Sequence, residues 1–204
     1  MLGQAILVGD HAALDFLNTI AAPRGEVIES ISDGNAYLSW LADVGLLEPS
    51  EIQKLLLKFG KPAVDQVARE ARELREWFRQ VITKSSATHV HWQTSSVIAK
   101  LNPILDMDSS YRQLEMFDKH LTLVERHRFT RARQLLVPVA QHIAELVTNG
   151  DPSLIKCCAN PPCTLWFYDR TKTHRRRFCS VSVCGNRVKV AAFRLRQQQS
   201  KKAV

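Results

Sequence analysis

Four cysteines near the C-terminus have a spacing that could hold a metal ion. Cys158 and Cys163 are separated by four residues, Cys179 and Cys184 are also separated by four, and 15 residues lie between the pairs. Such paired cysteines are typical of zinc sites, because Zn²⁺ takes four ligands tetrahedrally and each pair supplies two thiolates from one tight turn. Four thiolates leave no coordination position open. The spacing therefore predicts one zinc ion with a structural role.

Two neighbouring residues offer alternative ligands. Cys157 could replace Cys158 with a five-residue spacing, but the four-residue spacing of the second pair favours Cys158. His174 is the other alternative. Two disulfides or redox-active thiols are competing interpretations, and oxidation at Cys157 could release the metal. All five cysteines lie in the last quarter of a chain without a recognisable export signal, which favours metal binding.

Basic residues are concentrated in the same C-terminal segment. Residues 151–204 carry twelve Lys and Arg but two acids, a net charge of +10, whereas residues 1–150 carry −2. A basic segment on a nearly neutral body indicates a polyanionic partner, unless it is a solvated tail that aids solubility. The candidate nucleic-acid-binding residues are Arg175, Arg176, Arg177, Asn186, Arg187, Lys189, Arg194 and Arg196. Asn186 has a competing structural interpretation, as a helix cap or a brace for the cysteine turn.

The order of residues between the cysteines predicts how the segment folds. We expect a cysteine knuckle, a β-hairpin formed by residues 165–168 and 175–178, and a helix that begins near Gly185. Val188, Ala191, Ala192 and Leu195 recur at helical spacing and should pack on the hairpin. This layout is that of a small treble-clef-like zinc finger.

The first 150 residues read as a mainly α-helical, α+β domain. Helices are expected from His11, from residues 32–33, from residue 50, from Pro62, at 97–105 and from Thr130, with a loop at 83–96. Alternating apolar and polar residues at 111–117 and 120–129 predict a β-hairpin. The residues Asn149-Gly150-Asp151-Pro152 mark the expected boundary between a domain at 1–150 and a finger at 151–204.

The sequence argues against several classes of function. It contains no Gly-rich phosphate loop, nucleophile elbow or His-based metal motif, so we expect no enzyme and no catalytic residues. No apolar run approaches a bilayer span, which predicts a cytoplasmic protein without membrane contact. His11, Asp15 and Asn18 share one side of the first helix and could line a pocket for a small-molecule effector. A solvated or hydrogen-bonded structural cluster is the alternative.

These motifs resemble those of a known family. The run Cys184-Gly185-Asn186-Arg187, with Phe167-Tyr168-Asp169 and the other cysteines before it, is similar to the CGNR zinc finger. Residues 14–19 (LDFLNT) and 37–42 (YLSWLA) resemble its usual N-terminal partner, the ABATE domain. The resemblance covers most of the chain. It implies zinc ligation by the four cysteines and the role of a bacterial, stress-responsive transcription regulator.

The sequence therefore predicts a zinc-dependent DNA-binding regulator. Lys and Arg side chains would neutralise phosphates, so the affinity of residues 151–204 for duplex DNA should fall with salt. Asn186 and Arg187 are the candidates for reading bases. The alternatives are an RNA- or protein-binding module, in which Trp166 or Tyr168 could stack on unpaired bases, and a sensor acting through the N-terminal domain. No dimerisation element is evident, so the oligomeric state stays open.

Overall fold

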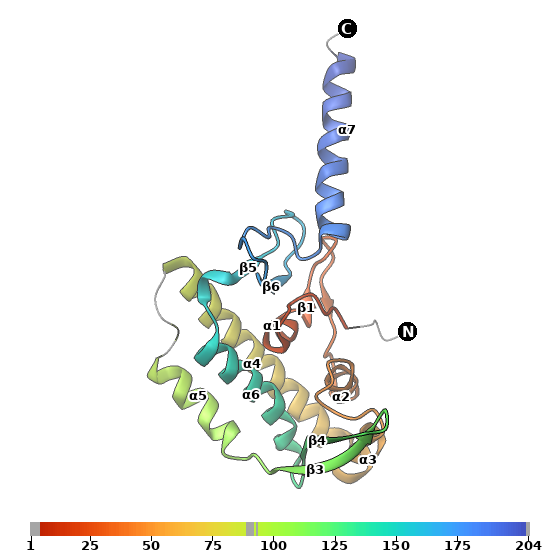
Figure 1. Ribbon diagram of the computed structural model, residues 1–204, viewed down its shortest axis with the longest axis vertical. Coiled ribbons are helices and arrows are strands. Elements are labelled where there is room, and N and C mark those ends of the chain that lie inside the picture. The colour runs from red at the N-terminus through yellow and green to blue at the C-terminus, as the bar shows by residue number, and fades with distance from the viewer. Residues whose placement is uncertain (1–4, 89–91, 93, 203–204) are drawn as a thin grey trace.

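The structure is a computed structural model that describes residues 5–88, 92 and 94–202 and places a helical body below a small C-terminal module (Figure 1). The elements are, in chain order, α1 (Ala12–Leu17), β1 (Ile20–Ala21), β2 (Ile28–Glu29), α2 (Gly34–Asp43), α3 (Glu51–Phe59), α4 (Lys61–Thr88), α5 (Ser95–Leu105), β3 (Ser110–Phe117), β4 (His120–His127), the 3₁₀-helix η1 (Ala132–Leu136), α6 (Val137–Asn149), η2 (Pro152–Leu154), β5 (Ile155–Cys157), β6 (Trp166–Tyr168), the π-turn η3 (Val181–Gly185) and α7 (Asn186–Lys202). The mainly helical fold class is confirmed.

Helix α4 is the central element of the helical body. It carries the predicted apolar stripe, including Val67, Leu74 and Phe78, and packs against α1, α2 and α3. Tyr37 of α2 is fully buried, and its hydroxyl donates a hydrogen bond to the Leu135 carbonyl at 3.0 Å. Burial of these large side chains is the main driving force for assembling the body.

The predicted loop at residues 83–96 is wrong over its first part, because α4 continues to Thr88. Its polar composition suggested a loop, but Ile82 and Ser85 continue the buried stripe and are 1% and 5% exposed. Tertiary packing thus prevails over local helix propensity. Residues 89–91 and 93 lie outside the described part of the chain.

The predicted β-hairpin is formed by β3 and β4. The strands pair antiparallel from Ser110↔His127 to Phe117↔His120, and Asp118 and Lys119 form the turn with φ of 45° and 66°. Two positive φ values suit the two-residue turns that match the twist of paired strands. Arg126 holds the hairpin to the body through an ion pair with Glu48, and a second ion pair with Glu115 links the two strands.

Helix α1 joins the helical body to the C-terminal module. It packs against α4, α6 and β6, although it is only six residues long. Its inward side chains Ala13, Leu14, Phe16 and Leu17 are all fully buried. Among the helices of the described residues, none combines the length and apolar character that a bilayer span requires.

The C-terminal module differs from the prediction in its strand pairing and in its last helix. β6 pairs with β5, not with residues 175–178, which form no strand. Ile155–Cys157, which precedes the first cysteine knuckle, takes the hydrogen-bonding edge of β6 that the sequence pattern had assigned to 175–178. Helix α7 projects from the module instead of packing on a hairpin (Figure 1). Ala191, Ala192 and Leu195 are consequently exposed.

Candidate metal centre and basic surface

The four predicted cysteines meet at one buried point. Cys158 and Cys163 lie in the turn that links β5 to β6, Cys179 precedes η3, and Cys184 lies within η3 just before α7. Their Sγ atoms all lie within 4.8 Å of one another, and each residue is at most 7% exposed. Segments far apart in the sequence therefore present four sulfur atoms to a single centre.

The geometry of this cluster fits one zinc ion. A tetrahedral site with Zn–S bonds of about 2.3 Å separates its sulfur atoms by about 3.8 Å. The Sγ of Cys179 lies 3.9 Å from that of Cys163 and 3.6 Å from that of Cys184. Burial, and then the charge of neighbouring thiolates, raises the pKa of Cys163 to about 12, so the thiols need a cation in order to ionise together. The prediction of one structural zinc is confirmed.

Two hydrogen bonds help to orient the sulfur atoms. The Cys179 N–H donates to the Cys158 Sγ, and the Asn160 side-chain amide donates to the Cys184 Sγ, both at 3.5 Å. Such contacts around a thiolate ligand fix its position and tune its charge. Asn160 is 6% exposed and was not identified from the sequence. Its position two residues after Cys158 was the available signal that its side chain could contact the cysteine sulfur atoms.

The structure resolves the alternatives at the metal centre. Cys157 is exposed and lies on β5 opposite Trp166, outside the cluster that Cys158 joins. Successive residues of a strand point to opposite sides, which separates the two thiols. The His174 ring lies near the Asp169 carbonyl oxygen, 3.2 Å from its Nδ1, and is likewise outside the cluster.

Residues from the N-terminus complete the core of the finger. Ala21 is buried against the cysteines, Leu165 and Phe167, and Ile6 and Val8 pack on the same cluster. The Tyr168 backbone N–H donates to the Gly9 carbonyl at 2.8 Å, and the Ala22 backbone N–H donates to the Thr164 side-chain hydroxyl at 2.8 Å. The finger thus shares its core with the start of the chain.

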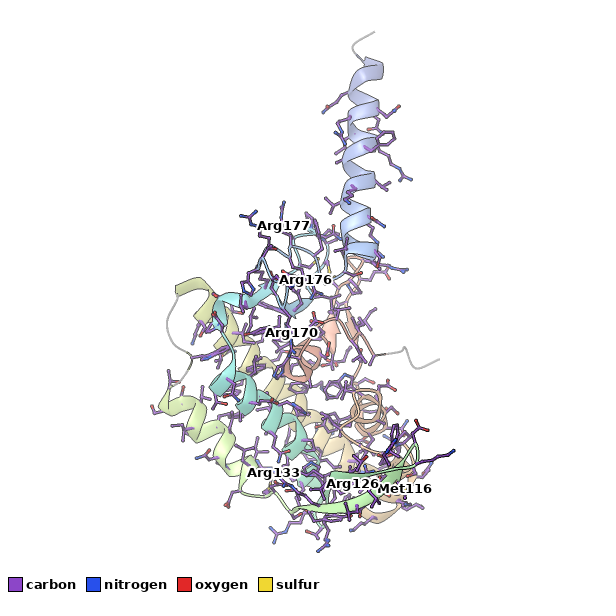
Figure 2. All side chains as sticks on the ribbon, in the orientation of Figure 1. Met116, Arg126, Arg133, Arg170, Arg176 and Arg177 are labelled. Atoms are coloured by element: carbon purple, nitrogen blue, oxygen red, sulfur yellow. The ribbon has the colours of Figure 1, made fainter. Side chains whose placement is uncertain are left out.

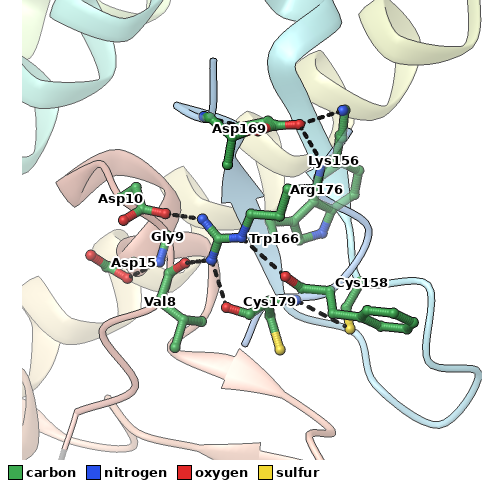
Figure 3. Close-up of polar contacts among 12 residues, drawn as sticks. Val8, Gly9, Asp10, Asp15, Lys156, Cys158, Trp166, Asp169, Arg176 and Cys179 are labelled. Carbon is green, nitrogen blue, oxygen red and sulfur yellow. Dashed lines mark hydrogen bonds and ion pairs between the residues drawn. The ribbon is translucent and has the colours of Figure 1, made fainter. Parts of the chain in front are cut away.

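Arg176 forms a clamp between the finger and the N-terminal segment (Figure 3). Its guanidinium pairs with the Asp10 carboxylate and donates to the carbonyl oxygens of Phe178 at 3.0 Å and Cys179 at 2.6 Å. It also lies 4.3 Å from the centre of the Phe167 ring. These contacts occupy the side chain within the molecule. They favour a structural role for Arg176 over the predicted role in nucleic-acid binding.

A buried carboxylate organises the turn between β6 and the clamp. Asp169 is fully buried and accepts hydrogen bonds from Lys156 Nζ at 2.6 Å, from the Thr171 hydroxyl at 2.6 Å and from the Arg176 backbone N–H at 2.9 Å. The sequence assigned no role to Asp169. The available signal was that Asp169 is one of only two acids in a strongly basic segment. Thr171 follows it by two residues, a spacing that is typical of such turns.

The other predicted basic residues divide by accessibility. Arg175, Arg177, Lys189, Arg194 and Arg196 are exposed, and Figure 2 shows Arg177 at the outer margin of the finger. Arg187 is half-buried and donates to the Pro23 carbonyl at 3.0 Å. Asn186 donates from its side chain to the Ser182 carbonyl at 3.1 Å, which fits the alternative that it braces the cysteine turn.

The basic residues of α7 lie on two sides of the helix. Positions seven apart share a side, so Arg187 and Arg194 flank one margin, and Lys189 and Arg196 flank the other. The apolar stripe with Ala191 and Leu195 lies between them, where it lines an open groove with Pro161 and Pro162. Helix α7 thus presents a positive margin on each side.

The three residues predicted to line an effector pocket all make hydrogen bonds within the fold. The His11 Nδ1 accepts a hydrogen bond from Ala13 N–H at 3.2 Å and caps α1. The Asp15 carboxylate accepts from Gly9 N–H at 2.8 Å. Asn18 is 2% exposed and bonds to the backbone of Trp166. Asp15 and Asn18 therefore hold the finger and the N-terminal segment in place, which favours the alternative of a hydrogen-bonded structural cluster.

Two family descriptions match the chain. The ABATE family, described as "Putative stress-induced transcription regulator", matches residues 10–150. The CGNR zinc finger matches residues 155–197. No curated protein matches the chain. The first match covers the α1–α6 body and the second covers the cysteine cluster together with most of α7.

Proposed function

Because the chain belongs to the ABATE family and carries a CGNR zinc finger, we propose that it is a non-enzymatic, zinc-dependent DNA-binding transcription regulator. The observation that carries the proposal is the arrangement of α7. The helix spans 17 residues, about 25 Å, and carries basic side chains along both margins. The major groove admits an α-helix and has a phosphate backbone on each side.

The zinc ion would act through the position of this helix. Cys184 lies one residue before Gly185, and α7 begins at Asn186. Metal ligation therefore fixes the first turn of the helix relative to the knuckle and to Arg175 and Arg177. Zinc supplies this rigidity and no reactive position, because all four ligands come from the protein.

Salt dependence tests the proposal directly. Fluorescence anisotropy of the full-length, zinc-loaded chain with labelled duplex DNA should give a log K that falls linearly with log salt. Chelation of zinc should remove most of the affinity. Lys189→Glu with Arg196→Glu should weaken binding about a hundredfold, because two phosphate contacts become repulsive.

A matched pair of charge reversals on the helical body controls for net charge. Arg69→Glu with Lys100→Glu alters the chain's net charge by the same amount, at exposed positions of α4 and α5. This variant should bind within about twofold of the wild type. Equal loss in both variants would contradict a specific role for α7. Stronger competition by single-stranded RNA than by duplex DNA would favour an RNA-binding finger.

A further inference from the structure

One face of the β3–β4 hairpin is apolar and open to solvent. Leu114 pairs with Leu123 across the strands, and Met116 pairs with Leu121. All four side chains are between 59% and 68% exposed. Exposed aliphatic side chains that adjoin one another in this way mark interaction surfaces. Figure 2 shows Met116 on the hairpin near Arg126, at the end of the body far from α7.

The other face of the hairpin is the one that contacts the body. Glu115 and Arg126 belong to it and are only partly exposed, and Arg126 reaches Glu48 at the end of the α2–α3 connection. Because side chains alternate between the faces of a strand, the apolar face must point away from this attachment. It is therefore accessible to a second molecule.

Charged residues bound the apolar face at both ends with opposite signs on each strand. On the β3 side, Arg112 lies at the base and Asp118 at the turn. On the β4 side, Lys119 lies at the turn and Glu125 at the base. All four are exposed. Arg112 and Glu125 lie on the same face as the leucines and form an ion pair across the strands at 3.8 Å. Asp118 and Lys119 form the turn beyond the last apolar pair. Each side of this face thus reads from base to turn as a charge, two apolar residues and the opposite charge.

We propose that this face pairs with the same face of a second copy of the chain. In an antiparallel two-fold arrangement, β3 lies over the partner's β3, so each Arg112 meets an Asp118 across the interface. Each Glu125 meets a Lys119 in the same way, and Leu114 lies over Met116. A two-fold contact requires a self-complementary surface, and this pattern supplies one in both charge and apolarity.

The antiparallel orientation also keeps the two bodies apart. The base of the hairpin is where the chain enters and leaves the body, so placing base over turn puts the bodies at opposite ends of the contact. The finger lies at the other end of the molecule (Figure 1). Dimerisation would leave α7 of each copy accessible, and the dimer does not depend on the proposed DNA binding. The small apolar area predicts micromolar affinity.

Sedimentation velocity of the full-length chain from low to high micromolar concentration tests the pairing. A monomer–dimer equilibrium is expected. Leu114→Glu should weaken dimerisation about a hundredfold by placing a charge in the apolar contact. Leu57→Glu is the matched control, because Leu57 on α3 is 84% exposed and lies outside the hairpin. A chain that stays monomeric throughout, or a dimer unaffected by Leu114→Glu, would overturn the proposal.

A charge-reversal cycle tests the orientation. Arg112→Glu should weaken the dimer about tenfold, because it faces the partner's Asp118. Adding Asp118→Lys should restore most of the affinity. Within one chain, positions 112 and 118 are about 20 Å apart along the hairpin. Only a contact between two copies can therefore restore the dimer affinity that Arg112→Glu removes. Lys119 already occupies a positive φ beside it, so Lys is tolerated in this turn. Absence of rescue would overturn the antiparallel arrangement.

Discussion

Asn18, which caps the C-terminal end of α1, and Trp166 of β6 exchange two hydrogen bonds across 148 positions of sequence. The Asn18 Nδ2 donates to the Trp166 carbonyl at 2.9 Å, and the Trp166 N–H donates to the Asn18 Oδ1 at 2.8 Å. A side-chain amide offers one donor and one acceptor, the same pair that a neighbouring strand would present. Asn18 therefore ties the helical body to the finger at the edge of β6.

Replacing Asn18 should destabilise the whole chain. Asn18→Ala leaves both backbone groups of Trp166 without their partner, which should lower the free energy of unfolding by about 2 to 3 kcal/mol. Chemical denaturation of the zinc-loaded protein measures the loss. Asn35→Ala at an exposed position of α2 is the control and should change stability by less than about 0.5 kcal/mol. Equal stability of both variants would rule out the proposed tie.

Arg176 and Arg177 should differ in what their removal changes. Arg176→Ala removes the clamp to Asp10, Phe178 and Cys179, and should lower the free energy of unfolding by about 2 kcal/mol or more. Arg177→Ala, at an exposed position, should leave thermal stability unchanged but reduce the salt slope of DNA binding by about one. Thermal melts and salt titrations on both variants separate the two roles. The reverse pattern would contradict the assignment.

Zinc content should depend on Cys163 but not on Cys157. Elemental analysis should find one zinc per chain in the wild type and in Cys157→Ser, because Cys157 lies outside the cluster. Cys163→Ser removes one of four ligands and should release most of the metal on mild chelation. Loss of zinc from Cys157→Ser would instead show that this neighbouring thiol is the ligand.

The isolated finger should not fold, contrary to the expectation that residues 151–204 bind DNA on their own. Ile6, Val8 and Ala21 complete its core, and Arg176 finds Asp10 in the N-terminal segment. A zinc-loaded 151–204 fragment should therefore show no cooperative thermal transition, whereas the full chain should show one. A fragment that melts cooperatively with zinc would mean that the N-terminal contacts are dispensable.

Asp15 should make stability fall as the pH rises. Burial raises the pKa of Asp15 to about 6, although its hydrogen bond from Gly9 opposes this. Asp15 therefore holds its proton more tightly in the folded state than in the unfolded state, where its pKa is near 3.8. Between about pH 4 and pH 6 the free energy of unfolding should fall by about 1 kcal/mol. The partial exposure of Asp15 keeps this fall smaller than the pKa difference alone would give.

Asp15→Asn is the matched variant, because its amide oxygen can still accept from Gly9. This variant should lack that part of the pH dependence, so its stability relative to the wild type should increase from pH 4 to pH 7. Denaturation curves at several pH values check the sign. A wild type that gains stability relative to Asp15→Asn over this interval would contradict a raised pKa.

Patterns local in sequence predicted much of the architecture. The α4 stripe, the β3–β4 hairpin and the short helix before it follow from periodicities of 3.6 and 2, which report the side of an element that is buried. The prediction failed where tertiary packing opposed local composition. Polar residues 83–88 continue α4, because Ile82 and Ser85 extend the face that packs on the core.

The metal centre and the surface around it depend on different kinds of information. Cysteine spacing specified four zinc ligands because a knuckle is a local turn, and its geometry depends on few residues. The partner of β6, the clamp role of Arg176 and the exposure of α7 were not predictable from spacing. The pairing of β6 depends on the choice of Ile155–Cys157 over residues 175–178, two segments at similar distances in the chain. The clamp depends on Asp10, which is distant in the sequence. The exposure of α7 follows because no other element among the described residues covers its apolar stripe. The same Arg side chain can bind a phosphate or a carboxylate, and only its tertiary neighbours select between them.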